Sequence, residues 1–122
     1  MIAGQLAELL GAKQVSVNAD ILTAYRFDRW CLKHWQDWRG EALDAPACVV
    51  RPRDSAEVQA VVRFAAEHNV AIVPWGLGSG VCGGIEPQPD QILIDMSAMN
   101  RVLSIDEENL LLTVEALSLI HI

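Results

Sequence analysis

The sequence of this 122-residue chain predicts an α+β fold. Three observations lead to this class. Apolar segments typical of strands outnumber the amphipathic segments typical of helices. A strand, a helix and a second strand follow one another in the middle of the chain, and no helix separates the strands that come later. We therefore expect a strand–helix–strand unit followed by a β-hairpin, with a short helical segment at the N-terminus, and not a doubly wound fold.

Two short helices are predicted in the N-terminal helical and connecting segment, residues 1–44. The first covers residues 3–10, whose leucines share one helical face, and Gly11 ends it. Asn18 or Asp20 is expected to cap the second helix. Both helices would precede the strands of the core.

Two stretches of this segment have more than one interpretation. Residues 15–17 are too short to assign. Residues 26–40 hold three of the four tryptophans, interleaved with Arg, Lys and His. They form either a cationic, aromatic rim for an anionic substrate or partner, or a connecting segment whose tryptophans pack over the domain edge. We favour the second interpretation, and we likewise expect His34 to be structural.

The helix after the first strand has clear sequence signals. Asp54 is a good N-cap, and Glu57 three residues later completes a capping box. Asn69 fits the C′ position. Apolar residues recur at positions i, i+3, i+4 and i+7, namely Val58, Val61, Val62 and Ala65. The flanking apolar runs, residues 46–50 and 70–73, predict parallel strands joined by a right-handed crossover.

The later part of the chain predicts three more strands. Residues 92–95 form the third strand, and residues 96–99 a short turn. Residues 101–105 and 110–115 are the fourth and fifth strands, and residues 106–109 are rich in turn formers. The last two strands should therefore pair as a hairpin.

A glycine-rich loop, residues 74–84, connects the second and third strands. Five of the eight glycines lie in it. Glycine permits positive φ and close approach of the backbone to a ligand, and successive N–H groups can form an anion site whose usual guest is phosphate. The loop begins at the carboxyl end of a parallel strand, where such sheets bind ligands. A mobile loop without a ligand is the alternative.

Two common phosphate motifs do not fit this loop. A Walker A motif needs Lys and then Ser or Thr after its last glycine, whereas residues 84–86 are Gly-Ile-Glu. Residues 78–83 match G-x-G-x-x-G literally, but that motif must open a helix. Pro87 and Pro89 disfavour a helix at this place. The loop backbone itself is therefore the predicted phosphate cradle.

The composition excludes several classes of protein. With 52% hydrophobic and 20% charged residues the chain is globular, not disordered. Its net charge of −7 argues against nucleic acid or an anionic membrane as the main partner. The sequence shows no apolar run of about 20 residues and no signal peptide. Three widely spaced cysteines suggest reduced thiols and no metal site. We expect a cytoplasmic protein, and leave open a peripheral association with a membrane.

Four segments resemble the PCMH-type FAD-binding domain, the fold of vanillyl-alcohol oxidase and p-cresol methylhydroxylase. They are CVVRPRDSAEV (48–58), VPWGLGSG (73–80), IDMSAMNRV (94–102) and VEA (114–116). The pattern is most similar to the branch that holds D-lactate dehydrogenases, glycolate oxidase FAD subunits and alkyldihydroxyacetonephosphate synthases. The resemblance implies that residues 45–116 are the first half of such a domain.

The resemblance also implies an FAD site in the glycine loop. Backbone amides of residues 74–80 would wrap the pyrophosphate, and Gly83 and Gly84 would let the chain turn beneath the flavin. Ser79 would add a hydroxyl donor. Some relatives carry a histidine at that position, bound covalently to the flavin, so serine implies non-covalent FAD. Trp75 stands where many relatives have an arginine or a small residue. The expected cofactor-binding residues are Pro74, Trp75, Gly76, Leu77, Gly78, Ser79, Gly80, Gly83 and Gly84.

For function, the resemblance implies a flavin-dependent oxidoreductase that passes a hydride from a 2-hydroxy acid, or a similar small anion, to FAD. A flavin-dependent, non-redox alkyl transferase of the alkyldihydroxyacetonephosphate synthase type is the alternative. A non-catalytic truncated fold is the second alternative. In this family the catalytic residues come largely from a later cap domain, so no catalytic residue is assigned. A homo-oligomer or a redox partner subunit stays open.

The last six residues, 117–122, depart from the family pattern, which continues Val-Glu-Ala-Gly into a further helix. Their sequence, LSLIHI, is what the end of a common sequencing adapter encodes in one reading frame. We therefore expect residues 117–122 to be non-native read-through, and the chain to be an N-terminal fragment of a longer protein.

Overall fold

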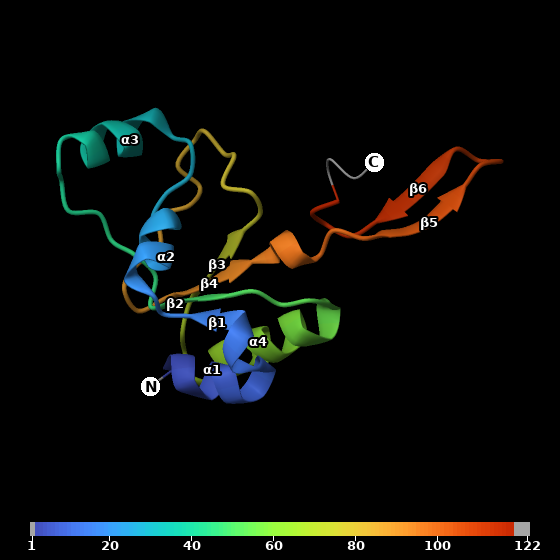
Figure 1. Cartoon of the computed structure of the whole chain (residues 1–122), viewed down its shortest axis with the longest axis horizontal. Coiled ribbons are helices and arrows are strands. Elements are labelled where there is room, and N and C mark those ends of the chain that lie inside the picture. The colour runs from blue at the N-terminus through green and yellow to red at the C-terminus, as the bar shows by residue number, and fades with distance from the viewer. Residues whose placement is uncertain (1, 119–122) are drawn as a thin grey trace.

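The computed structural model describes residues 2–118 and has the predicted α+β fold (Figure 1). The strands are β1 (Val15–Ser16), β2 (Cys48–Val50), β3 (Ile72–Trp75), β4 (Ile92–Asp95), β5 (Val102–Asp106) and β6 (Leu111–Val114). The helices are α1 (Ile2–Leu10), α2 (Ala19–Ala24), α3 (Cys31–Trp38) and α4 (Ser55–Glu67), with 3-10 turns η1 (Ala12–Gln14) and η2 (Met96–Ala98). Among these helices, none has the length and apolar character to span a bilayer.

Four strands form one mixed sheet in the order β1-β2-β4-β3. As predicted, β2 and β3 run in the same direction, because both are parallel to β4. However, β4 lies between them, with Ile92 opposite both Cys48 and Ile72. The short stretch left unassigned in the sequence forms β1, an antiparallel edge strand beside β2. The carboxyl ends of β2, β3 and β4 therefore meet at one edge.

The core lies between one face of this sheet and helices α1 and α4 (Figure 1). Alternate strand residues share this face, since side chains alternate across a strand. The core side chains are Leu6, Cys48, Val50, Val61, Phe64, Ala65, Ile92 and Ile94. The apolar stripe predicted for this helix included Val62, but Val62 is 47% exposed, and Phe64 is buried instead. The buried stripe of α4 thus runs through Val61, Phe64 and Ala65.

Asn18, Asp54 and Asn69 act as the sequence predicts, whereas Glu57 accepts the N–H of Arg53 and not that of the N-cap residue Asp54, as a capping box would require. Asn18 accepts hydrogen bonds from the backbone N–H groups that open α2. Asp54 accepts the N–H of Glu57 at 2.9 Å, and the Glu57 carboxylate in turn accepts the N–H of Arg53 at 2.7 Å. Asn69 has φ 53°, the left-handed conformation expected after a helix.

The second strand ends later than predicted. Pro74 and Trp75 belong to β3, paired with Ile94 and Asp95, so the loop begins at Gly76. Proline lacks the N–H that a central strand needs, but β3 is an edge strand and tolerates it. Two of the predicted loop residues are therefore part of the sheet.

The predicted hairpin is formed by β5 and β6, which project away from the sheet (Figure 1). An irregularity between Val102 and Ser104 changes the register. Cross-strand pairing then places Val102, Ile105, Leu112 and Val114 on one face of the hairpin. At its base, Arg101 donates to Glu115 through its backbone N–H and its guanidinium, at 2.6 to 3.0 Å.

Two predictions about the organisation of the chain stay predictions. The first is the division at residues 44/45; Leu6 of the N-terminal segment contributes to the same core as β2 and β4. The second is the origin of residues 117–122. Residues 119–122 lie outside the described part of the chain, whereas the Leu117 N–H donates to the Met99 carbonyl at 3.0 Å.

Candidate functional site

The candidate site lies where the glycine-rich loop leaves β3, at the carboxyl ends of β2, β3 and β4. Gly78 has φ 64°, in the left-handed region that favours glycine. Within residues 2–118, none of the backbone N–H groups of residues 77–80 donates a hydrogen bond. Ser79 and Gly80 are exposed. Gly78 is buried, and Leu77 is exposed like Ser79 and Gly80. Four consecutive N–H groups thus lack an acceptor in the described residues, and an anion is the acceptor that suits such a set.

Three glycines of the loop have no room for a side chain. A Cβ on Gly78 would lie 2.3 Å from the Trp75 ring, and a Cβ on Gly83, which has φ 72°, would lie 2.4 Å from the Trp30 ring. A Cβ on Gly80 would lie 2.9 Å from the Asp28 carboxylate. These contacts belong to the protein itself, so the glycines allow the loop to pack against its neighbours.

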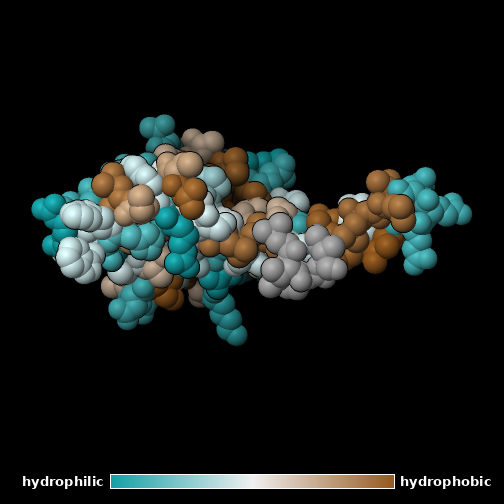
Figure 2. All heavy atoms as spheres, turned by 90° about the horizontal axis from the view of Figure 1, so that it is seen from above, coloured by the Kyte–Doolittle hydropathy of each residue, from teal (hydrophilic) through white to brown (hydrophobic). Residues whose placement is uncertain are grey.

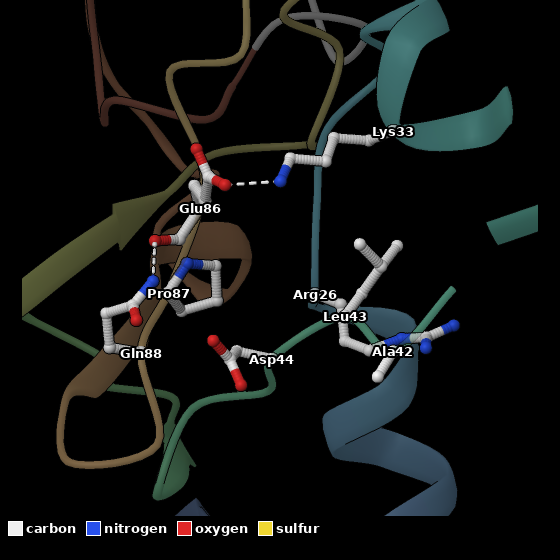
Figure 3. A pocket seen from close by; sticks show the side chains of 8 residues that line it. All are labelled: Arg26, Lys33, Ala42, Leu43, Asp44, Glu86, Pro87 and Gln88. Atoms are coloured by element: carbon white, nitrogen blue, oxygen red, sulfur yellow. Dashed lines mark hydrogen bonds and ion pairs between the residues drawn. The ribbon is translucent and has the colours of Figure 1, made fainter. Parts of the chain in front are cut away.

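Residues 28–33, which we call the clamp segment, hold the loop in place. Asp28 accepts the N–H of Trp30 at 2.9 Å and that of Gly84 at 3.1 Å. The Arg29 N–H donates to the Gly80 carbonyl at 2.8 Å. Lys33 at the end of the clamp segment forms an ion pair with Glu86, and Figure 3 shows the two side chains facing each other. Sequence reasoning did not identify these contacts.

A small hollow beside the loop is lined by one guanidinium, that of Arg29, and by the carboxylate of Asp28. Its lining is Ala24, Phe27, Asp28, Arg29, His34, Trp75, Leu77 and Gly78. Arg29 forms no ion pair within the part of the chain that the structure describes. An unpaired guanidinium beside free N–H groups favours an anionic guest. Arg29 is therefore a site residue that the sequence signalled only through the basic character of residues 26–40.

The other basic residues of that stretch are paired with acids. Arg26 contacts Asp37 at 2.7 Å, and Arg39 contacts Glu41 at 3.4 Å. The prediction that its tryptophans pack over the domain edge holds for Trp30 but is wrong for Trp35 and Trp38, which are 52% and 81% exposed. The stretch therefore presents little free positive charge besides Arg29.

A second polar group, Tyr25, Arg51 and Asp95, joins the ends of β2 and β4. Both Tyr25 and Arg51 donate to Asp95, at 2.7 and 2.8 Å, and Arg51 also donates to the Tyr25 hydroxyl at 2.9 Å. Burial raises the pKa of Asp95, but hydrogen bonds from Ser97, Tyr25 and Arg51 outweigh burial and hold that pKa below its usual value. Tyr25 also packs on Trp75, with ring centroids 4.7 Å apart.

The structure brings together only part of the predicted site. Residues 76–80 lie together at the edge of the sheet, next to Trp75. Gly83 and Gly84 contact the clamp segment, as Gly80 also does. Among residues 2–118, no cluster of three or more His, Cys, Asp or Glu side chains has a geometry that would hold a metal ion.

Residues 46–117 match the model of the FAD binding domain family. Alkyldihydroxyacetonephosphate synthase of Trypanosoma brucei brucei is 32% identical over 110 residues, which are 86% of this chain and 18% of that protein. Glycolate oxidase subunit GlcD of Bacillus subtilis is 40% identical over 70 residues, 57% of this chain and 15% of that protein. The chain thus spans less than a fifth of the length of these two relatives.

Solved structures with the same fold agree with this match. An alkyldihydroxyacetonephosphate synthase superposes with TM-score 0.80 and 28% identity over 88% of this chain and 20% of that one. A p-cresol methylhydroxylase with substrate bound superposes with TM-score 0.64 and 26% identity over 86% of this chain and 19% of that one. The PCMH-type resemblance is confirmed, and the chain belongs to the FAD-binding domain family.

Proposed function

We propose that the glycine-rich loop binds the pyrophosphate of FAD through the backbone N–H groups of residues 77–80. The observation that carries this proposal is that these four consecutive N–H groups have no acceptor in residues 2–118. Arg29 adds a local positive charge from the neighbouring hollow, within a chain whose net charge is −7. Trp75 and the clamp segment fix the loop from the two sides.

The FAD is held without a covalent bond in this proposal. Ser79 is exposed in the loop, and its hydroxyl can donate to a phosphate oxygen but cannot replace an imidazole as a flavin ligand. The test is acid precipitation of the purified flavoprotein. Flavin released into the supernatant supports the proposal, whereas flavin that stays in the pellet contradicts it.

The proposed reaction is the oxidation of a 2-hydroxy acid or a similar small anion, in which bound FAD supplies the hydride acceptor. Glycolate oxidase subunit GlcD, 40% identical over its matched region, supports this reaction class. The role of the described residues is to bind and orient the cofactor. The experiment is anaerobic addition of a panel of D- and L-2-hydroxy acids, with loss of the flavin visible absorbance as the readout.

A second candidate function is non-redox alkyl transfer. It is favoured by the longer match to alkyldihydroxyacetonephosphate synthase, which covers 86% of this chain, and by the TM-score of 0.80. The two candidates differ in the anaerobic experiment. An oxidoreductase gives lasting reduction of the flavin with one member of the hydroxy-acid panel. An alkyl transferase gives no reduction by any of them and exchanges an acyl group for an alcohol.

A further inference from the structure

Asp28 is a buried carboxylate with no cationic partner in the described chain. It is 3% exposed, and its two donors are the backbone N–H groups of Trp30 and Gly84, at 2.9 and 3.1 Å. A carboxylate removed from water is costly unless its oxygens accept hydrogen bonds. These two N–H groups therefore fix where Asp28 lies, and the carboxylate in turn fixes them.

The same carboxylate contacts both ends of the turn at residues 80–84. Its Oδ2 accepts from Gly84 and lies 2.9 Å from the position of a Cβ on Gly80. The neighbouring Arg29 N–H binds the Gly80 carbonyl at 2.8 Å. This half of the glycine-rich loop is thus folded around one side chain from the clamp segment.

The loop consequently has two sets of N–H groups. The Gly84 N–H donates to the Asp28 carboxylate. The N–H groups of residues 77–80 have no acceptor within residues 2–118. We propose that Asp28 is a positioning residue of the FAD site: its carboxylate holds the turn at residues 80–84 and thereby presents the N–H groups of residues 77–80 to the cofactor pyrophosphate. The inference rests on the function proposed above.

The substitution Asp28→Asn separates positioning from simple electrostatics. An amide keeps the size of the side chain but has one acceptor oxygen, so its NH₂ group would face the N–H of Gly84 or Trp30. Loss of the carboxylate contact therefore weakens cofactor binding if Asp28 positions the loop. If its charge merely repelled phosphate, removal of that charge would strengthen binding. The sign of the change decides between the two roles.

The experiment titrates FAD, and separately ADP, into the purified protein freed of flavin. Asp20→Asn is the control, because Asp20 is exposed in α2 and its substitution removes the same charge. We expect Asp28→Asn to weaken both ligands about tenfold, since ADP carries the same pyrophosphate, and Asp20→Asn to change neither. Unfolding curves of the flavin-free variants give the folded fraction, for which each affinity is corrected.

An affinity of Asp28→Asn equal to, or tighter than, that of the unsubstituted protein overturns the inference and leaves the FAD proposal intact. Failure of the unsubstituted protein to bind FAD overturns both. If Asp28→Asn does not fold, hydrogen exchange of the unsubstituted protein tests the positioning role of Asp28 in its place. Without FAD, hydrogen exchange of the Gly84 N–H should be at least about tenfold slower than that of Ser79 or Gly80. Equal exchange rates would overturn the positioning role.

Discussion

The four-stranded sheet and the β5–β6 hairpin are made of similar apolar residues but lie in different surroundings. Every residue of β4 is buried, and Ile92 and Leu93 are fully so. In the hairpin, Ile105 is 68% and Leu111 62% exposed. Figure 2 shows hydrophobic residues of the hairpin on the surface of the projecting arm. A strand pattern in the sequence thus gives the local conformation, whereas burial depends on what packs against the strand.

The sharpest test of the difference in burial is to shorten one isoleucine side chain in the sheet and one in the hairpin. We expect Ile92→Ala to lower the free energy of unfolding by about 2–5 kcal/mol, because it leaves a cavity in the core. Ile105→Ala removes the same atoms from an exposed position and should change it by less than about 0.5 kcal/mol. Urea unfolding of both variants measures the difference. Equal losses would mean that the hairpin is buried in the folded protein.

A second pair contrasts glycines in and outside the loop. Gly78→Ala introduces a Cβ at positive φ and 2.3 Å from the Trp75 ring, so we expect a loss of about 2–4 kcal/mol. Gly4→Ala lies in α1 with open space around it and should stabilise the protein by up to about 1 kcal/mol. Thermal unfolding compares the two. A neutral Gly78→Ala would show that Trp75 does not pack on the loop.

The sheet and the hairpin can also be compared in how their stability depends on pH, because each contains a carboxylate with a shifted pKa. Hydrogen bonds lower the pKa of Asp95 at the end of β4 and of Asp106 at the end of β5. A lowered pKa stabilises the protein above the unfolded-state pKa, near 4, and this stability is lost as the pH falls through the folded-state pKa.

We therefore expect Asp95→Asn to lose about 1–3 kcal/mol near neutral pH and to flatten the acid side of the stability profile. Asp106→Asn removes a carboxylate from an exposed site, where solvent screens its interactions, and should change the profile much less. Urea unfolding in steps between about pH 6 and pH 3 provides the measurement. Parallel profiles for Asp95→Asn and the unsubstituted protein would contradict the assigned role of Asp95.

Substitutions on the apolar face of the hairpin should raise the solubility of the protein without changing its free energy of unfolding. Ile105 and Leu112 are cross-strand partners on its apolar face. Replacing them together by Lys and Glu keeps a favourable pair and removes exposed apolar surface. We expect a higher solubility limit and a free energy of unfolding within about 0.5 kcal/mol of the original. A large loss of stability would show that this face is needed for folding.

The smallest effect concerns the thiols. Burial in β2 raises the pKa of Cys48 to about 11, whereas Cys31 and Cys82 are exposed. The thiolate is the reactive form, so native protein should react with a thiol reagent at two of its three cysteines. Reaction of the third should follow only unfolding. Rapid reaction at Cys48 would contradict the burial of β2.

Local signals predicted most of the elements. Asp54 and Asn69 indicated the two ends of α4, and the Asp54 cap on the Glu57 N–H and the left-handed Asn69 are both present. The position of β4 between β2 and β3 was not predicted, because strand order depends on long-range pairing. The burial of Phe64 in place of Val62 likewise depends on how α4 sits on the sheet.

The candidate site was predicted only in part for the same reason. The glycine content of residues 76–84 marked the loop, and the family resemblance indicated its ligand. Asp28 and Arg29 lie about fifty residues earlier, and no local pattern connects them to Gly80 or Gly84. Asp95 lies at the end of a strand that the sequence predicted, but its partners Tyr25 and Arg51 come from other elements.

The central claim, that residues 77–80 bind the FAD pyrophosphate, is tested most directly by hydrogen exchange of the purified protein with and without FAD. The account predicts that FAD slows exchange of the N–H groups of residues 77–80, whereas those of the β5–β6 hairpin keep their rates. Unchanged exchange in the loop at saturating FAD would contradict it, because the phosphate would then be bound elsewhere.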